Sequence, residues 1–316
     1  MIKVKDLTKD YGNLRAVDNI SFDIPDSGII GILGPNGAGK TTTLQMITGF
    51  MPPTEGEVYV DNLNIAQNSL EIRKKIGYLP EGSPTYADMN VVDFLYFIAH
   101  LKNVHSDILD KRVKDMIRTY GLEQVVGKEI NQLSKGFKQR VSLAGASIHN
   151  PEILILDEPT NGLDPNQIVE IRSLIKELGQ EKTILVSTHI LREVEAVCDH
   201  VIIIDKGKIV ADNSLEEVQS SFHNLTQIYF EIQADTDRLM DEFKTIPEVK
   251  NTQLYDKEAN IYKLYVNYAK DKELRPTLYD FIKKKDWVIL EMRRHQQTLE
   301  DVFRRLTEKD QEDTNE

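Results

Sequence analysis

Short apolar runs alternate with helical patterns along the N-terminal part of the chain. GIIGIL (28–33), EILILD (152–157) and TILVSTH (183–189) are apolar almost throughout instead of alternating with polar residues. This pattern is typical of strands that are buried on both faces of a parallel sheet. Polar residues gather at the carboxyl ends of these runs, which is the edge of an open α/β sheet where ligands bind. The pattern therefore predicts an α/β domain with a buried parallel sheet.

Two further patterns predict a smaller antiparallel layer. Near the N-terminus, IKVKDL (2–7) and NISFDIP (19–25) alternate apolar and polar residues, as strands with one solvated face do. Farther along, VIIIDKGKIV (201–210) predicts a hairpin that turns at Lys206 and Gly207.

Between about residues 84 and 150 the strand pattern gives way to helical periodicity. It is carried by VVDFLYFIAHL, ILDKRVKDMIRTYGL and FKQRVSLAGASI. We expect a helical insert here, between two strands of the sheet.

The pattern changes again near residue 220, after the polar SLEEVQSSFHN. The expected order is then strand, helix, two strands, helix and strand, at 226–233, 236–244, 248–255, 260–267, 271–284 and 287–293. This is the βαββαβ order of a ferredoxin-like unit, for which we expect bounds of 221–308. A last helix is expected to carry Leu299, Val302, Phe303 and Leu306 on one face. The acidic tail 309–316 is expected to be disordered.

Composition limits the kinds of partner. The 316 residues carry a net charge of −12, the wrong sign for a protein that binds a phosphate backbone, so we expect no nucleic acid. The single cysteine, Cys198, has apolar neighbours and is interpreted as a small core residue of a protein from a reducing compartment. No apolar run approaches the roughly 20 residues that cross a bilayer. We expect another polypeptide to supply any membrane crossing.

GPNGAGKT (34–41) follows the predicted strand 28–33 and leads into the apolar-periodic TLQMITGF. It matches G-x-x-x-x-G-K-[ST] in the strand–loop–helix context that this motif requires. The glycines let backbone N–H groups converge on β- and γ-phosphate oxygens, Lys40 adds a positive charge, and the Thr41 hydroxyl is placed to ligate Mg²⁺. A chance glycine turn is the alternative. The expected nucleotide-binding residues are Gly34, Pro35, Asn36, Gly37, Ala38, Gly39, Lys40, Thr41 and Thr42.

EILILDE ends its predicted strand with two adjacent acids. A carboxylate at the mouth of a parallel sheet is costly unless it is paired, and Mg²⁺ on the phosphates is a natural partner for Asp157. Glu158 is expected to point the other way along the pleat, where it could take a proton from an attacking water. The alternative is that both acids simply cap the next element, DEPTNGLDP.

NQLSKGFKQRVSLAGASI predicts a second helix whose N-terminus suits an anion. Ser134 is the candidate N-cap, and Gly136 would let a ligand approach the backbone closely. Without its context, this segment is simply a capped helix.

These motifs follow one another in a fixed order: the P-loop, LSKGFKQR about a hundred residues later, ILDEP, GLDP and STH. In this order they resemble the ATPase subunit of an ABC transporter, over residues 1 to about 215. The LSKGFKQR form, the LPE segment and the C-terminal extension are similar to single-domain exporter ATPases of the gliding-motility and multidrug-export types. The resemblance implies a P-loop NTPase fold for residues 1–220, with ATP and Mg²⁺ as cofactors.

The resemblance also assigns roles by position. Tyr11 matches the aromatic residue that stacks on adenine, although a strand-end tyrosine is the alternative. Ser134 and Gly136 match the signature that contacts the γ-phosphate held by the opposite subunit, and Asp164 matches the loop that crosses the dimer seam. His189 matches the histidine that holds the γ-phosphate and the attacking water, although a histidine at a strand end is often structural.

Two positions depart from the family pattern. Glu81 stands where the family usually has glutamine; it could ligate Mg²⁺ through a water, but its charge would oppose that of the phosphates. Lys135 and Phe137 replace the usual glycine and glutamine of the signature, whereas Ser134 and Gly136 are retained. We therefore expect hydrolysis to survive.

The sequence is thus interpreted as an ATPase that dimerises head to tail around two Mg·ATP and drives a separate membrane permease. The expected location is the cytoplasmic face of the membrane, and the expected contact with the permease lies around Glu81 to Met89 and the helical insert. Two alternatives stay open. One is a soluble ABC-type ATPase that acts on ribosomes or DNA, and the other is a regulatory nucleotide binder that no longer hydrolyses.

Overall fold

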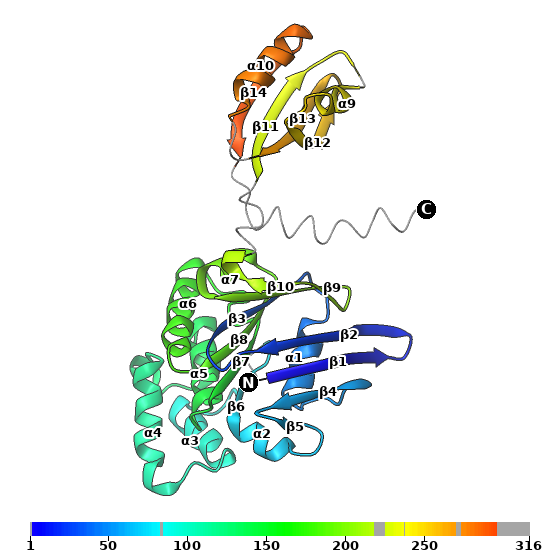
Figure 1. The fold of residues 1–316 in the computed structure, drawn as a ribbon. Coiled ribbons are helices and arrows are strands. Elements are labelled where there is room, and N and C mark those ends of the chain that lie inside the picture. Colours follow the sequence, from blue (N-terminus) through cyan, green and yellow to red (C-terminus); the bar gives the residue numbers. More distant parts are fainter. Residues whose placement is uncertain (1, 83–84, 218–224, 237, 270–272, 296–316) are drawn as a thin grey trace. The chain divides into compact units, whose positions relative to one another are not determined.

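The computed structural model describes residues 2–82, 85–217, 225–236, 238–269 and 273–295. Contacts divide the chain into two units, Met1–Leu215 and Glu216–Glu316, close to the boundary expected near residue 220 (Figure 1). The helix expected around Leu299 to Leu306 and the tail 309–316 lie outside the described residues. In the part of the chain that is described, no helix is long and apolar enough to span a membrane.

The first unit is built on a six-stranded sheet with the order β10-β9-β3-β8-β7-β6. All neighbours are parallel except the antiparallel pair β9 and β10. The three apolar runs of the sequence form its centre, as predicted. The strands are β3 (Gly28–Leu33), β6 (Ile76–Leu79), β7 (Ile153–Asp157), β8 (Thr183–Thr188), β9 (His200–Asp205) and β10 (Lys208–Ser214).

The turn between β9 and β10 confirms the predicted hairpin, but the hairpin lies at the edge of the six-stranded sheet, so our expectation that it belongs to the smaller antiparallel layer was wrong. Lys206 and Gly207 both have positive φ, 46° and 80°. A tight turn with two left-handed central residues matches the twist of the flanking strands.

A second, antiparallel sheet has the order β2-β1-β4-β5. Its strands are β1 (Ile2–Tyr11), β2 (Leu14–Ile24), β4 (Glu55–Val60) and β5 (Leu63–Asn64). Buried side chains of both sheets form one hydrophobic core with helix α1 (Lys40–Ile47). The loop before α1 lies between the two layers, because Ala38 belongs to this core, Gly34 lies against Ile204 of β9 and Gly39 lies against Ala16 of β2.

The region expected as a helical insert contains α3 (Val91–Leu101), α4 (Ser106–Thr119) and α5 (Lys135–Ser147), which pack on one another (Figure 1). Short 3-10 turns lie at Glu123–Val125 and Ile130–Gln132. Further helices among the described residues flank the strands of the first unit: α2 (Ser69–Lys75), α6 (Pro165–Gly179) and α7 (Leu191–Val197).

The described residues of the second unit form an antiparallel sheet with the order β12-β13-β11-β14 and two helices. Its elements are β11 (Leu225–Gln233), α9 (Leu239–Lys244), β12 (Val249–Glu258), β13 (Ile261–Ala269), α10 (Arg275–Lys284) and β14 (Val288–His295). Side chains from the helices and one sheet face form its core, among them Phe230, Phe243 and Leu278. This is the predicted order of elements; the ferredoxin-like assignment stays a prediction.

Candidate functional site

The glycines of the loop between β3 and α1 serve different purposes. A Cβ on Gly34 would lie 2.2 Å from the carbonyl oxygen of Ile204, and one on Gly39 would lie 2.5 Å from that of Ala16. Both residues therefore allow close approach to the protein's own backbone. Gly37 has a φ of 82°, and a Cβ added there would meet nothing within 4 Å, so it is the glycine with open space beside it. The sequence had suggested one role for all three.

The loop borders a cleft of about 600 Å³. Lining residues come from the P-loop, from both sheets and from the ends of β7 and β8. They are Tyr11, Leu14, Ala16, Asn36, Gly37, Gly39, Lys40, Thr41, Thr42, Glu81, Glu158, Asn161 and His189. Three expected nucleotide-binding residues, Gly34, Pro35 and Ala38, are not among them. Ala38 instead belongs to the core, with 2 % of its surface exposed.

Lys40 is a buried cation at the start of α1. Its Nζ donates to the carbonyl oxygens of Gly34 at 2.8 Å and Pro35 at 3.2 Å, and lies 3.5 Å from Oε1 of Glu158. The ammonium is thus fixed beside the N-terminus of α1, where the helix dipole also favours negative charge. This end of the cleft is suited to an anion.

Asp157 ends β7 and is fully buried. Its Oδ1 accepts hydrogen bonds from the Thr41 hydroxyl at 3.2 Å and from the Ser187 hydroxyl, whereas Oδ2 has no partner. Burial raises the pKa of this carboxyl and repulsion from Glu81 adds to the rise, while the two hydroxyls and Lys40 oppose it. Ser187 was not among the residues singled out from the sequence, although it stands in the STH motif.

An unpartnered buried carboxylate oxygen beside a hydroxyl fits a hard divalent cation such as Mg²⁺. Among the described residues there is no group of three or more His, Cys, Asp or Glu that could hold a metal by itself. Asp157 and Thr41 therefore suit a cation that takes few protein ligands and completes its coordination shell with phosphate oxygens and water, as Mg²⁺ does.

Glu158 is oriented by a backbone turn, and our expectation that the strand pleat directs it was wrong. The residue lies beyond the end of β7 and has a φ of 49°, a conformation that is uncommon for a non-glycine residue. Its N–H donates to the carbonyl and the hydroxyl oxygens of Ser187, at 3.2 and 3.0 Å. The carboxylate, with 8 % of the residue exposed, lies 3.0 Å from Nδ1 of His189 and faces Lys40.

Glu81 follows β6 and lines the same cleft. Its Oε1 accepts a hydrogen bond from the side-chain amide of Asn161 at 3.0 Å. Asn161 also lines the cleft but was missed in the sequence; its place between DEPT and GLDP was the available signal. The contact joins the loop after β6 to the loop after β7.

Ser134, Gly136 and Asp164 are not among the described residues that line the cleft. Ser134 caps α5: its exposed hydroxyl accepts from the N–H of Phe137 at 3.4 Å and keeps its proton free to donate. Asp164 caps α6, with Oδ1 accepting two backbone N–H groups at 3.0 Å, so Asp164 and not Asp157 or Glu158 is the helix cap of this segment.

The helix N-termini that carry these residues lie against each other. A Cβ on Gly136 would meet the side chain of Gln167, in the first turn of α6, at 2.6 Å. A Cβ on Gly162 would meet Nζ of Lys135. One chain therefore carries two separate groups of candidate residues, one in the cleft and one at the start of α5 and α6.

Known proteins provide an independent comparison. The family model described as "ABC transporter" matches residues 17–161. The bacitracin transport ATP-binding protein BcrA of Bacillus licheniformis is 40% identical over 214 residues, which cover 67% of this chain and 69% of BcrA. The ABC transporter ATP-binding protein YdbJ of Bacillus subtilis, whose name marks it as uncharacterized, is 32% identical over 99% of this chain and 97% of its own length.

Solved structures give the same result for the larger part of the chain. One described as the ATP-binding subunit of an ABC transporter is 29% identical, with a TM-score of 0.64 over 70% of this chain and 93% of that one. The cassette MJ0796, described as dimeric in a post-hydrolysis state with ADP and Pi, is 29% identical, with a TM-score of 0.62 over 68% of this chain and 99% of its own. The chain therefore belongs to the ABC transporter family, as one of its ATP-binding subunits and an ATPase.

Proposed function

We propose that two copies of this ATPase close around two Mg·ATP, each held between the cleft of one copy and Ser134, Gly136 and Asp164 of the partner subunit. The separation of the two groups of residues within one chain supports this arrangement most strongly, because neither group alone surrounds a triphosphate. The dimer described for MJ0796 with ADP and Pi supports it independently.

Within each site the residues have distinct roles in the proposal. Tyr11, 44 % exposed at the edge of the cleft, stacks on the adenine. Lys40 and the P-loop N–H groups bind the β- and γ-phosphates. Thr41 and Asp157 would hold Mg²⁺, Glu81 would contribute through a water, and the cation would offset charge on the phosphate oxygens.

Glu158 is the proposed general base. Its carboxylate faces the cleft within 3.0 Å of His189 and 3.5 Å of Lys40, so a water beside the γ-phosphate would lie within its reach. His189 positions that water and the γ-phosphate. The water attacks phosphorus in line, its proton passes to Glu158, and ADP leaves.

Replacing Glu158 with Gln tests this role. We expect ATP affinity to change little and turnover to fall by roughly 10² to 10⁴, because glutamine keeps the shape of the side chain but accepts no proton. Single-turnover hydrolysis and equilibrium ATP binding separate the two effects. A variant that hydrolyses ATP at the normal rate would remove Glu158 from the mechanism and would favour another base.

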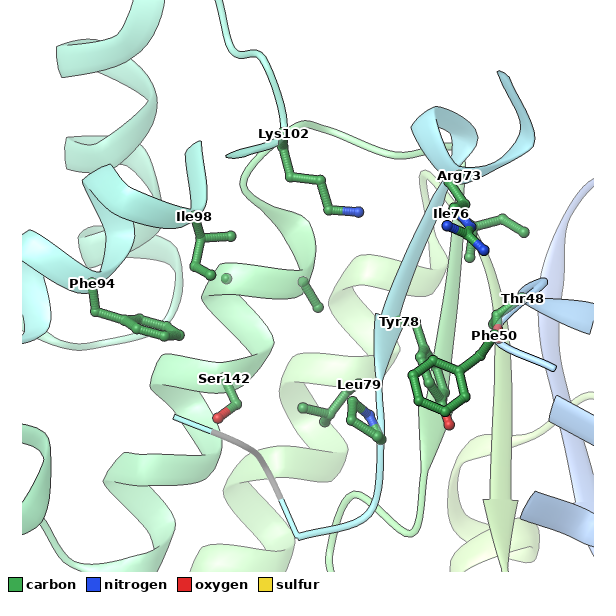
Figure 2. Close-up of a pocket in the computed structure, with 13 residues that line it drawn as sticks. Thr48, Phe50, Arg73, Ile76, Tyr78, Leu79, Phe94, Ile98, Lys102 and Ser142 are labelled. Carbon is green, nitrogen blue, oxygen red and sulfur yellow. The ribbon is translucent and has the colours of Figure 1, made fainter. Parts of the chain in front are cut away.

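A second concavity is the proposed contact with the permease. This permease groove, of about 570 Å³, lies where the helical region meets the sheet and is lined by Thr48, Phe50, Arg73, Ile76, Tyr78, Leu79, Pro80, Phe94, Ile98, Lys102, Ser142, Gly145 and Ala146 (Figure 2). Leu79 and Pro80 line the groove, and the next residue, Glu81, lines the ATP cleft. A segment bound in the groove would therefore be one residue away from the nucleotide site.

The charge of the groove indicates what would bind there. Lys102 extends over it from the end of α3 (Figure 2), and burial together with the neighbouring Arg73 lowers the pKa of its ammonium. No acidic residue is among the described residues that line the groove. An apolar helix of the permease with one carboxylate near Lys102 would fit both the lining and the unbalanced charge.

A photo-crosslinking amino acid at Phe50, which is 72 % exposed, tests the contact. In detergent extracts we expect a crosslink to a multi-span membrane protein, and no such product when the probe stands at Val169, which is 59 % exposed on α6. Equal labelling at both positions, or labelling of ribosomal proteins from Phe50, would contradict the proposal. The ribosomal result would favour a soluble ABC-type ATPase.

Through the permease, the protein would sit at the cytoplasmic face of the membrane. We propose export as the direction, because the LSKGFKQR form, the LPE segment and the C-terminal extension resemble those of single-domain exporter ATPases. A regulatory binder that does not hydrolyse is disfavoured, because Lys40, Asp157, Glu158 and His189 are all present and converge at one end of the cleft.

A further inference from the structure

The loop that carries Glu158 and the strand end that carries His189 are tied together at a second point. Glu193, on α7, is buried with 5 % of its surface exposed. Its Oε1 accepts a hydrogen bond from the Thr160 hydroxyl, and its Oε2 accepts one from the Thr188 hydroxyl at 2.7 Å. Thr160 follows Glu158 by two residues, and Thr188 directly precedes His189.

These contacts close a ring. On one side Glu158 meets His189 at 3.0 Å, and on the other side Glu193 bridges the segments that bear them. Thr188 is held further, because its hydroxyl also accepts from the N–H of Ile190 at 3.0 Å. A carboxylate that bonds to both segments restricts how far either can move relative to the other.

A buried carboxylate is costly unless its charge is compensated. Two hydroxyl donors and Arg172, whose Nη2 lies 3.8 Å from Oε1, provide that compensation here. The carboxylate is the shared acceptor for the Thr160 and Thr188 hydroxyls, which are both buried, and an apolar side chain would leave both hydroxyls without this partner. The donors and the cation therefore form a site built around the carboxylate.

We infer that Glu193 is a positioning residue for ATP hydrolysis, which sets the distance between Glu158 and His189 and couples the loop 158–164 to the γ-phosphate. It touches neither nucleotide nor water in this role. The inference rests on the proposed roles of Glu158 and His189. Because the same loop ends at Asp164, Glu193 would also link the dimer seam to His189.

Kinetics of Glu193→Leu test the inference. We expect kcat to fall about 10- to 100-fold while the KM for ATP changes less than about threefold, because misplacing catalytic groups by 1 Å can cost that much without altering phosphate contacts. Glu193→Gln can still accept from one threonine and donate to the other, so it should recover most of the rate. Glu195→Gln, a matched change at an exposed position of the same helix, should have no effect.

If Glu193→Leu folds poorly, Thr160→Val and Thr188→Val test the inference in its place. Each should lower kcat, and adding either to Glu193→Leu should cause little further loss, since the interactions act as one unit. Unchanged kcat in Glu193→Leu, effects that add fully, or losses confined to ATP binding would each overturn the inference. Glu158→Gln run in parallel distinguishes the two failures: if it is inactive while Glu193→Leu is normal, only the role of Glu193 is lost.

Discussion

The buried carboxyl of Asp157 should lower the stability of the nucleotide-free protein. Its Oδ2 is buried without a partner, and burial raises its pKa. In Asp157→Asn the remaining oxygen can still accept from Thr41 and Ser187, whereas the charge is gone. An unpartnered buried charge costs more than an unpartnered neutral group, by about 1–2 kcal/mol. We therefore expect the variant to be more stable than the natural protein.

In a unit that spans Met1–Leu215, this gain corresponds to a rise in melting temperature of about 2–8 °C. Scanning calorimetry without nucleotide at pH 8 measures it. With Mg·ATP at 100 times its Kd, the natural protein should gain about 2.7 kcal/mol from binding, and Asp157→Asn should gain much less because it lacks a cation ligand. The order of melting temperatures should then reverse.

The effect of pH has a definite sign. A carboxyl with a raised pKa in the folded state favours folding below its unfolded pKa of about 3.9, and this contribution is lost as the pH rises through the folded value. The natural protein thus bears the full cost at pH 8, and the advantage of Asp157→Asn should shrink as the pH is lowered. A variant that melts below the natural protein at pH 8, or a difference that does not change with pH, would refute the reasoning.

Three further changes probe other parts of the cleft. Glu81→Gln removes a negative charge near the phosphates and should tighten ATP binding a fewfold, by up to about 1 kcal/mol, as measured by titration at two salt concentrations; weaker binding would contradict this. Gly39→Ala should lower the melting temperature more than Gly37→Ala, because only the Gly39 variant places a Cβ against a carbonyl oxygen. Equal decreases in melting temperature would show that the left-handed φ, which both glycines share, is the only cause. Ser187→Ala removes the hydroxyl that donates to Asp157 and accepts from the N–H of Glu158. We therefore expect kcat to fall by about tenfold or more in a steady-state assay. An unchanged kcat would show that the turn at Glu158 keeps its shape without the Ser187 hydroxyl.

Local patterns in the sequence were sufficient for much of the fold. Continuous apolar runs gave the central strands, because a strand covered on both faces needs no polar positions. The Lys206-Gly207 pair gave the hairpin, because its turn requires left-handed residues. Strands β4 and β6 were not singled out, since EGEVYV begins with two glutamates around a glycine and IGYL is only four residues long, so neither forms a continuous apolar run.

Local patterns in the sequence predicted only part of the candidate site. The motifs identified Lys40, Asp157, Glu158 and His189, all of which the structure places together. The positive φ of Glu158 could not be predicted, because the hydrogen bonds that hold it come from a residue on the neighbouring strand. The same holds for Glu193, whose partner Thr160 lies 33 residues away in sequence.

The molecular mass of the protein in solution tests most directly whether two copies share ATP. Glu158→Gln should run as a 36.2 kDa monomer without nucleotide and at twice that mass with saturating Mg·ATP, measured by light scattering. Adding Ser134→Asp, which keeps an N-cap but places a negative charge toward the phosphate, should abolish the shift, whereas adding Ser106→Asp at the start of α4 should not. A protein that binds ATP and stays monomeric, or a dimer indifferent to Ser134→Asp, would contradict the shared site.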